Sequence, residues 1–334
     1  MPRLTPLDEY FVHQIPEPLP NVVTHHHHWR ESMFFVLHPR DGLGDVVILT
    51  MAHFPARQEM DSLQLGTIGG QPAVAHHVRS AARDPHTFVA GPVRIEVVEP
   101  FKTVRLRVDD VAEAPVSLDL TFSARTAPYG LRRGTMRAGH ELIWDQSHML
   151  QSGTYRGSFT REGRTYDVED WWGQRDHSWG IRDHARCPFW MWLAVQLPDG
   201  MFGVWHWELA NGARVYTDGC FAPADGGDPV PIVDVAHDLT WLDDDGEAVS
   251  YARDGADVTG IGGRVELTLD GGTVVGLDAR GTWAQRYGEL GGGLSQVEVT
   301  TDDGRRGTAI YELTGAHHHR YFPIPRAEHL PPNG

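Results

Sequence analysis

Four stretches of the chain alternate apolar with polar or charged side chains at almost every position. They are Arg94–Glu99, Thr103–Asp109, Ser117–Ser123 and Arg264–Asp270. A period of two places the apolar side chains on one face of a β-strand, whereas an amphipathic helix needs a period near 3.6. The pattern therefore predicts half-buried antiparallel strands, which strongly limits the folds that are open to this chain.

Turn signals recur along the chain and separate these stretches. They are Asp41–Gly42, Glu162–Gly163, Pro198–Gly200, Asn211–Gly212, Asp245–Gly246, Asp270–Gly272 and Asp303–Gly304. Such dipeptides favour the tight turns that join short strands. The best helix candidate, residues 74–82, is short. We therefore predict an all-β protein made of antiparallel barrels or sandwiches.

The length of the chain indicates two domains. Its 334 residues exceed the ~150 residues of a typical domain about twofold. We expect one β domain over residues 1–160 and a second over residues 185–334. Because no Pro- or Ser-rich linker separates them, we expect residues 161–184 to form a packed joint, and clefts at such joints are favoured ligand sites.

Charge and composition exclude several classes of partner. The formal net charge of −16 would repel nucleic acids and anionic membranes. The longest apolar runs, such as Met33–Leu37, fall far short of the ~20 residues that a membrane helix needs. Cys187 and Cys220 form neither a disulfide framework nor a metal-ligand pattern. We expect a soluble cytoplasmic protein without stable membrane insertion, and a homodimer stays open.

The stretch Asp170–Asp183 combines three tryptophans, two arginines, three aspartates and a histidine. Buried charges persist only when they are paired and hydrogen-bonded, and groups with shifted pKa values gather at functional sites. The stretch therefore predicts a buried polar site. The alternative is an ion pair between Asp176 and Arg175 or Arg182 that only ties the two domains together.

A hairpin is predicted where Trp190–Leu197 and Met201–Glu208 flank Pro198–Gly200. A three-residue loop pairs Trp192 with His206 and Trp190 with Glu208. The predicted ligand face of the hairpin then carries Trp190, Trp192, Ala194, Gln196, Phe202, Val204, His206 and Glu208, whereas Trp205 and Trp207 belong to the core face. A two-residue loop would shift this register by one residue.

The motifs Gly153–Gly157, Gly163–Tyr166 and Trp172–Gly180, with Trp29–Phe35 as an opening strand, resemble a known family. They are similar to bacterial relatives of carotenoid 1,2-hydratase (hydroxyneurosporene synthase), to AttH-like proteins and to fungal decalin-forming Diels–Alderases. The resemblance covers roughly residues 20–320. It implies two lipocalin-like β-barrels and, in the known enzymes, isoprenoid or polyketide substrates handled without a redox cofactor.

Hydration of an alkene, or cyclisation of a polyene, needs an acid that can protonate carbon and aromatic faces that stabilise the cation. We therefore expect Asp176 to be the acid and His177 or His206 to be its partner. The residues expected to contact the substrate are Trp172, Arg175, Trp179, Trp190, Trp192 and Glu208. For Glu208 the alternative is a partly exposed strand carboxylate.

Two histidine runs suggest a metal site. His25, His27 and Glu31 would share one face of a strand, as in half of a cupin signature. His317–His319 form the second run. The alternative for both runs is polar histidines at strand edges, and neither metal nor cofactor is expected on balance.

Three functions are consistent with the sequence. The first is a cofactor-independent, acid-catalysed hydratase, isomerase or cyclase that acts on a hydrophobic, isoprenoid-like small molecule. The second is a non-catalytic binder or carrier of such a molecule. The third is a metal-dependent, cupin-like enzyme that uses His25, His27 and Glu31.

Overall fold

The computed structural model describes residues 4–11, 26–80, 88–186, 189–209, 211–251, 255–287 and 291–314. The chain divides into two compact units. The first comprises Met1–Arg40, Gly44–Arg182 and Ala222–Pro229, and the second comprises Asp41–Leu43, Asp183–Phe221 and Val230–Gly334. Within the described residues the helices are short 3-10 turns: η1 (Pro6–Glu9), η2 (Pro55–Arg57) and η3 (His184–Arg186). The predicted two-part all-β fold is confirmed, whereas the predicted packed joint stays a prediction.

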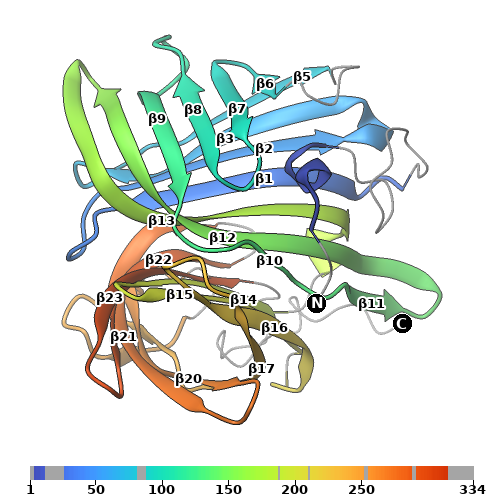
Figure 1. Ribbon diagram of the computed structural model, residues 1–334, viewed down its shortest axis with the longest axis vertical. Helices are drawn as coiled ribbons and strands as arrows, with labels where there is room; N and C mark the ends of the chain where they lie inside the picture. The colour runs from blue at the N-terminus through green and yellow to red at the C-terminus, as the bar shows by residue number, and fades with distance from the viewer. Residues whose placement is uncertain are drawn as a thin grey trace. The chain divides into compact units, whose positions relative to one another are not determined.

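The first unit contains a 13-stranded antiparallel sheet (Figure 1). Its main order is β4-β3-β2-β1-β13-β12-β9-β8-β7-β6, with β5 paired to β3 and with β10 and β11 paired to β12. The strands are β1 (Trp29–His38), β2 (Val46–Phe54), β3 (Glu59–Ile68), β4 (Gln71–Pro72), β5 (Ala75–Ser80), β6 (Val89–Ala90), β7 (Val93–Glu99), β8 (Thr103–Val108), β9 (Ser117–Ala124), β10 (Tyr129–Gly130), β11 (Gly134–Ala138), β12 (Glu141–Arg161) and β13 (Arg164–Arg182).

The second unit contains a 10-stranded antiparallel sheet that closes on itself, because β17 pairs with β20. The closed ring runs β17-β16-β15-β14-β23-β22-β21-β20, and β18 and β19 extend it. The strands are β14 (Phe189–Leu197), β15 (Gly200–Glu208), β16 (Arg214–Pro223), β17 (Val230–His237), β18 (Thr240–Leu242), β19 (Ala248–Val249), β20 (Gly260–Leu269), β21 (Val274–Arg286), β22 (Gly292–Thr301) and β23 (Arg306–Thr314).

The long hairpin of β12 and β13 lies at the centre of the first sheet. Its turn consists of Glu162 and Gly163, which have φ angles of 51° and 77°. Two left-handed residues form a turn whose twist matches that of the flanking strands, which is why a glycine is suited to this position. Arg161 therefore pairs with Arg164, and β13 continues between β12 and β1. The turn predicted at Glu162–Gly163 is confirmed.

The helix candidate at residues 74–82 is wrong for the part that the structure describes, residues 74–80. Residues Ala75–Ser80 form the strand β5, in which half-buried and exposed side chains alternate. The segment pairs with β3 from Gln64–Ala75 to Glu59–Ser80. Cross-strand hydrogen bonding outweighs the weak local helix preference of a short segment.

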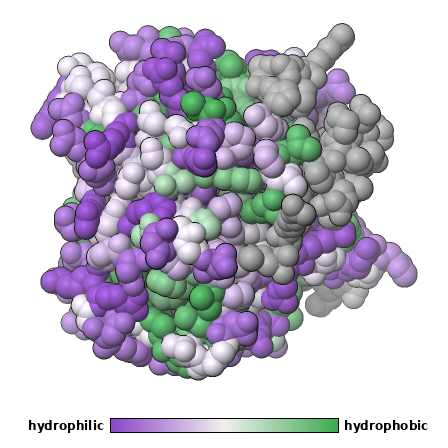
Figure 2. Space-filling model, in the orientation of Figure 1, coloured by the Kyte–Doolittle hydropathy of each residue, from purple (hydrophilic) through white to green (hydrophobic). Residues whose placement is uncertain are grey.

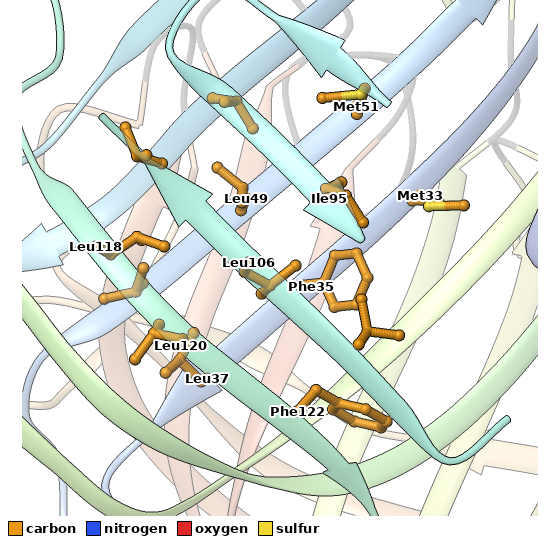
Figure 3. Packing of buried hydrophobic residues seen from close by; sticks show 14 of the residues in the cluster. Met33, Phe35, Leu37, Leu49, Met51, Ile95, Leu106, Leu118, Leu120 and Phe122 are labelled. Atoms are coloured by element: carbon orange, nitrogen blue, oxygen red, sulfur yellow. The ribbon is translucent and has the colours of Figure 1, made fainter. Parts of the chain in front are cut away.

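The apolar core of the first unit lies on the inner face of its curved sheet. Side chains from β1, β2, β7, β8 and β9 meet there, as Figure 3 shows for Phe35, Leu49, Ile95, Leu106 and Phe122. Each side chain of this size that is fully buried contributes roughly 1.5–3 kcal/mol. The two edges of the sheet approach each other where Ser62 Oγ donates a hydrogen bond of 2.9 Å to the carbonyl oxygen of Ala90.

The surface is predominantly hydrophilic on the face shown in Figure 2, where apolar side chains gather in small groups. Large exposed apolar side chains such as Val78, Val98, Val233 and Val274 are spread over different strands. The described residues include no helix that is both long and apolar enough to cross a lipid bilayer.

Replacing Gly173 with alanine is expected to destabilise the protein by more than about 3 kcal/mol. A Cβ atom at this position of β13 would lie 1.8 Å from the carbonyl oxygen of Val36, so the strand pairing must shift. Urea unfolding measures the effect. The control is Gly163→Ala, where no atom lies within 4 Å of the added carbon and only the left-handed backbone costs about 1 kcal/mol. Equal losses in the two variants would contradict the prediction.

Candidate functional site

Strand β13 places the residues of the stretch Asp170–Asp183 that belong to it on two opposite faces of the first sheet. Successive side chains of a strand point to opposite sides, and β13 pairs continuously with β1 from Trp172 to Ile181. Arg175 and His177 therefore lie on the inner face, which the apolar core shares, because their partners on β1 are Phe35 and Met33.

Arg175 is buried on this inner face and forms a fork with Glu9 of η1. Its two terminal nitrogens donate hydrogen bonds of 2.5 and 2.6 Å to the Glu9 carboxylate. Arg175 is 2% exposed and Glu9 is fully buried. The edge of the guanidinium formed by Nε and Nη2 also donates to Gln151 Oε1, with distances of 3.0 Å from Nε and 2.7 Å from Nη2. Such bidentate, charge-assisted pairs are among the strongest polar contacts in proteins.

The backbone of Phe101 completes this network. Its N–H donates to Glu9 Oε1, and its carbonyl oxygen accepts a hydrogen bond of 2.8 Å from Gln151 Nε2. Phe101 has a φ angle of 60°, which is a left-handed conformation that bulky residues rarely adopt. Strained residues of this kind cluster at functional sites, where the surrounding contacts hold them in place.

The pKa of Glu9 is lowered below its usual value of 4.5. Burial acts to raise this pKa, but the opposing contributions together exceed it. They come from the charge and hydrogen bonds of Arg175, the Phe101 N–H and His177. Glu9 is therefore a carboxylate at neutral pH, and it neutralises the buried guanidinium.

His177 lies next to this network and faces a second buried acid. Its Nδ1 hydrogen bonds to the carbonyl oxygen of Asp8, and its Nε2 lies 3.1 Å from Glu31 Oε1, with exposed fractions of 1% and 0% for the two side chains. The Phe11 ring packs edge-on against the imidazole with centroids 5.8 Å apart, and the Trp179 ring does so at 5.5 Å. The pair is thus enclosed by aromatic rings.

The N-terminal segment supplies three of these contacts, through the Asp8 carbonyl oxygen, the Glu9 carboxylate and the Phe11 ring. Figure 1 shows η1 in dark blue beside β1 and β2. On β2, the His53 ring stacks on Phe11 with centroids 6.2 Å apart. Burial lowers the pKa of His53, although the nearby Glu31 opposes the effect. His53 is therefore neutral at pH 7, and the charged groups of the site are separated from solvent by apolar rings.

A small pocket of the first unit, with room for about one water molecule, reaches the same region. It is lined by Trp29, Arg133, Asp145, Gln146, Ser147, Trp179 and Gly180. Arg133 Nε donates a hydrogen bond of 2.5 Å to Asp145 Oδ1 at its wall. Because Trp179 also contacts the His177 ring, this pocket lies one aromatic side chain away from the His177–Glu31 pair.

The opposite face of β13 carries Asp176, Ser178 and Arg182. Arg182 Nη2 donates hydrogen bonds of 3.1 Å to Ser32 Oγ and 2.9 Å to Ser178 Oγ. His148 of β12 pairs with Ser178, and burial followed by the charge of Arg182 holds its pKa well below 6.5. This face is therefore a second buried polar region, in which Asp176 is 9% exposed.

The predicted partnership of Asp176 with His177 is wrong, because adjacent residues of an extended strand point to opposite faces. The tryptophans of β13 that were predicted to line the substrate pocket also lie on opposite faces of the strand. Trp179 lies on the His177 face, whereas Trp172 lies on the Asp176 face, where the guanidinium carbons of Arg40 and Arg125 lie 4.7 and 4.5 Å from its ring centroid. The individual roles proposed for Asp176, Arg175 and the tryptophans stay predictions.

The predicted register of the hairpin in the second unit is also wrong. Leu197 pairs with Gly200, so the loop has two residues, and Trp190 and Trp192 pair with Trp207 and Trp205. The four tryptophans therefore share one face, with Ala194, Gln196, Met201 and Gly203. His206 and Glu208 instead share the core-facing side of the barrel with Phe189, Met191, Phe202 and Val204. The tighter turn shifts every side chain of β15 by one position relative to β14.

His206 and Glu208 meet a third residue that the sequence analysis did not single out. Glu208 Oε1 lies 3.0 Å from His206 Nε2 and 2.9 Å from His237 Nε2, and the three side chains are 5% exposed or less. Thr217 Oγ1 lies 2.7 Å from His206 Nδ1. The alternative of a partly exposed Glu208 is therefore wrong. Imidazole and carboxylate groups are donor types that bind divalent metals.

The cupin-like arrangement is wrong for the residues that can be placed. His27 is exposed in the turn that precedes β1, and the strand begins only at Trp29. Glu31 is buried and faces His177 and His53. His25 and His317–His319 lie outside the described residues.

Several members of the candidate site were missed because their partners are distant in sequence. Glu9 lies 166 positions from Arg175, and no local pattern connects them. Glu31 was considered only as a metal ligand, although a carboxylate on the apolar face of β1 with Met33 and Phe35 also indicates a buried polar partner. His237 carried the same signal, because it shares a face of β17 with the core residue Val235.

Comparison with known proteins places the chain in a family. Residues 4–254 match the model of a family of unknown function, DUF8625. The chain belongs to the DUF8625 family. No curated protein matches its sequence.

Solved structures share the fold at low sequence identity. A Nitrosomonas europaea protein described as an AttH (NE1406) is 12% identical, with a TM-score of 0.61 over 86% of this chain and 92% of its own. Kievitone hydratase from Nectria haematococca is 12% identical, with a TM-score of 0.56 over 85% and 89%. CghA, determined with Sch210972, is 14% identical, with a TM-score of 0.52 over 86% and 88%. The AttH-like fold expected from the motifs agrees with these structures.

Glu9→Gln is expected to lower the free energy of unfolding at pH 7 by about 3–5 kcal/mol, because it leaves Arg175 buried without a compensating charge. Chemical unfolding measures the loss. The matched control is Glu99→Gln, whose carboxylate is 54% exposed and pairs with Lys102. Removal of such a surface pair is expected to cost less than about 1 kcal/mol.

The contribution of Glu9 to stability is expected to disappear in acid. Its pKa is lower in the folded protein than the usual 4.5, so the contribution is complete above that pH and is lost as the pH falls through the folded value. The difference in unfolding free energy between wild type and Glu9→Gln should shrink below pH 4.5. A difference that stays constant or grows as the pH falls would contradict the assigned charge state.

Proposed function

We propose that the protein is a cofactor-independent lyase, isomerase or cyclase that moves protons with the His177–Glu31 pair inside its first unit. The observation that carries the proposal is the contact of 3.1 Å between two fully buried titratable side chains. A buried acid and base within reach of each other, beside a pocket, are a common feature of acid–base catalytic sites.

The positions that protons can occupy on His177 and Glu31 support a role in proton transfer. A carbonyl oxygen can only accept a hydrogen bond, so the contact with Asp8 places a proton on His177 Nδ1. The Nε2 lone pair would then face a carboxylate unless one further proton resides on Nε2 or on Glu31. Either group can release that proton to a substrate and recover it, as general acid–base catalysis requires.

The surroundings suit a hydrophobic substrate with a developing positive charge. The rings of Phe11 and Trp179 lie beside His177, and aromatic faces stabilise a desolvated cation by about 2 kcal/mol or more. The Arg175–Glu9 pair is internally neutral and therefore does not repel such a cation strongly. Protonation of an isolated alkene, followed by addition of water or by cyclisation, is chemistry that this environment favours.

The similar structures point in the same direction. One of them is a hydratase by name, and another was determined with a small molecule bound. At 12–14% identity these proteins share the fold with this chain, and their names suggest the reaction class to test. An isoprenoid-like alkene, as the resemblance of the motifs suggests, is the substrate class that we propose first.

The test is turnover of acyclic prenyl alkenes by wild type and by conservative variants. Geraniol, farnesol and lycopene are incubated with the protein in D₂O, and mass spectrometry follows the addition of water and the incorporation of deuterium. His177→Gln and Glu31→Gln should each lower the rate by about 10²-fold or more while the circular dichroism spectrum is retained.

The control variant is Asp176→Asn, on the opposite face of β13. Full activity in this variant together with loss in His177→Gln and Glu31→Gln is expected. Loss only in Asp176→Asn would move the site to the Ser178–Arg182 face, and full activity in His177→Gln would overturn the proposal.

A binder of hydrophobic carboxylic acids is the second candidate, and the Glu9–Arg175 fork favours it. A carboxylate that belongs to the chain itself occupies a buried guanidinium at the edge of an apolar interior. A ligand with a carboxylate head and an apolar tail would match the same surroundings after displacement of η1. Native mass spectrometry with long-chain fatty acids tests this function, and Glu9→Ala should bind them more tightly than wild type.

A further inference from the structure

We propose that His206, Glu208 and His237 of the second unit form a binding site for a divalent transition metal. The three residues come from two strands of the closed barrel. His206 and Glu208 lie two positions apart on β15, and His237 is the last residue of β17. Their ligating atoms, two imidazole nitrogens and one carboxylate oxygen, all lie within 4.8 Å of one another.

The two separations that involve the Glu208 carboxylate match those of ligands at right angles on one metal. Bonds of about 2.1 Å from a metal to nitrogen or oxygen place two ligands at right angles about 3.0 Å apart, whereas a tetrahedral angle places them about 3.4 Å apart. The observed separations from Glu208 Oε1 are 3.0 Å to His206 and 2.9 Å to His237. Two histidines and one carboxylate occupy three coordination positions of a metal and leave its other positions open.

The environment of the three residues also favours a cation. All three side chains are 5% exposed or less, and the Glu208 carboxylate brings a negative charge to this buried site. A divalent ion would compensate the cost of burying that charge. The ligands lie on hydrogen-bonded strands, which hold them more precisely than loops do.

Thr217 supplies the outer contact that metal-bound histidines usually make. Its Oγ1 lies 2.7 Å from His206 Nδ1, so a proton on Nδ1 can be donated to the hydroxyl while Nε2 is left for the metal. Such contacts fix the tautomer and the orientation of the ring. The competing explanation is a metal-free network in which both imidazoles donate to Glu208, and this network would satisfy the same distances.

The experiment compares metal binding by a parent protein and by variants of the site. In the parent, His25–His28 and His317–His319 are replaced by serine, because the runs could bind metal by themselves. After treatment with EDTA, the protein is titrated with Zn²⁺ and Co²⁺, and binding is followed by native mass spectrometry, the visible spectrum of Co²⁺ and the melting temperature. One equivalent is expected to bind, and Tm should rise by about 5–10 °C at a hundredfold excess over Kd.

The variants separate a metal site from a hydrogen-bonded network. Glu208→Gln and His237→Gln should abolish the Co²⁺ spectrum and the metal-dependent rise in Tm, even if they also lower the Tm of the metal-free protein. Thr217→Val should weaken binding by about 10–100-fold, and it tests the site if the other two variants fail to fold. His76→Ala is the control, because His76 pairs with Asp61 at 3.1 Å on the exposed strand β5, and it should bind as the parent does.

Two results would overturn the proposal. One is the absence of stoichiometric metal in the parent at saturating Zn²⁺ and Co²⁺, and the other is unchanged binding in Glu208→Gln and His237→Gln. Either result would leave the metal-free network as the explanation. Neither would affect the proton transfer proposed for His177 and Glu31, which lie in the other unit.

Discussion

The alternation of side chains along β13 is the constraint on which the candidate site depends. The strand is hydrogen-bonded to β1 on one side and to β12 on the other, so none of its residues can rotate to the opposite face without loss of that pairing. Arg175 and His177 are therefore committed to the inner face, and Asp176 to the outer one. Gly173 and Gly180 are needed for the same strand pairing, because a Cβ at either position would lie within 2.1 Å of a backbone oxygen of a neighbouring strand.

Burial of a guanidinium on the inner face requires an anion, and η1 provides it. The Glu9 carboxylate offers both oxygens to Arg175, while Phe101 and Gln151 hold the remaining polar atoms. Formation of this pair also brings the Asp8 carbonyl oxygen and the Phe11 ring to His177. The ion pair thus couples folding of the N-terminal segment to assembly of the proposed proton-transfer site, and removal of either charge would disturb both.

In the second unit, a difference of one residue in the length of a turn decides which side chains lie close together. Because the loop after Leu197 has two residues, the four tryptophans of β14 and β15 gather on one face, and His206 and Glu208 turn toward the core. There they meet His237, which the closure of the barrel through β17 and β20 brings close. A three-residue loop would have left Glu208 opposite Trp190, with no third ligand from β17.

The sequence by itself determined the class of the fold and the type of most elements. The alternation in Thr103–Asp109 and Ser117–Ser123 specifies strands, and Glu162–Gly163 specifies their turn, because period and turn chemistry are local properties. It also marked the motif in which Arg175 and His177 lie. Only the tertiary structure decided their partners. Glu9 and Glu31 lie more than a hundred positions away, and contacts at that separation depend on which strands pair and in which register, which no local pattern encodes.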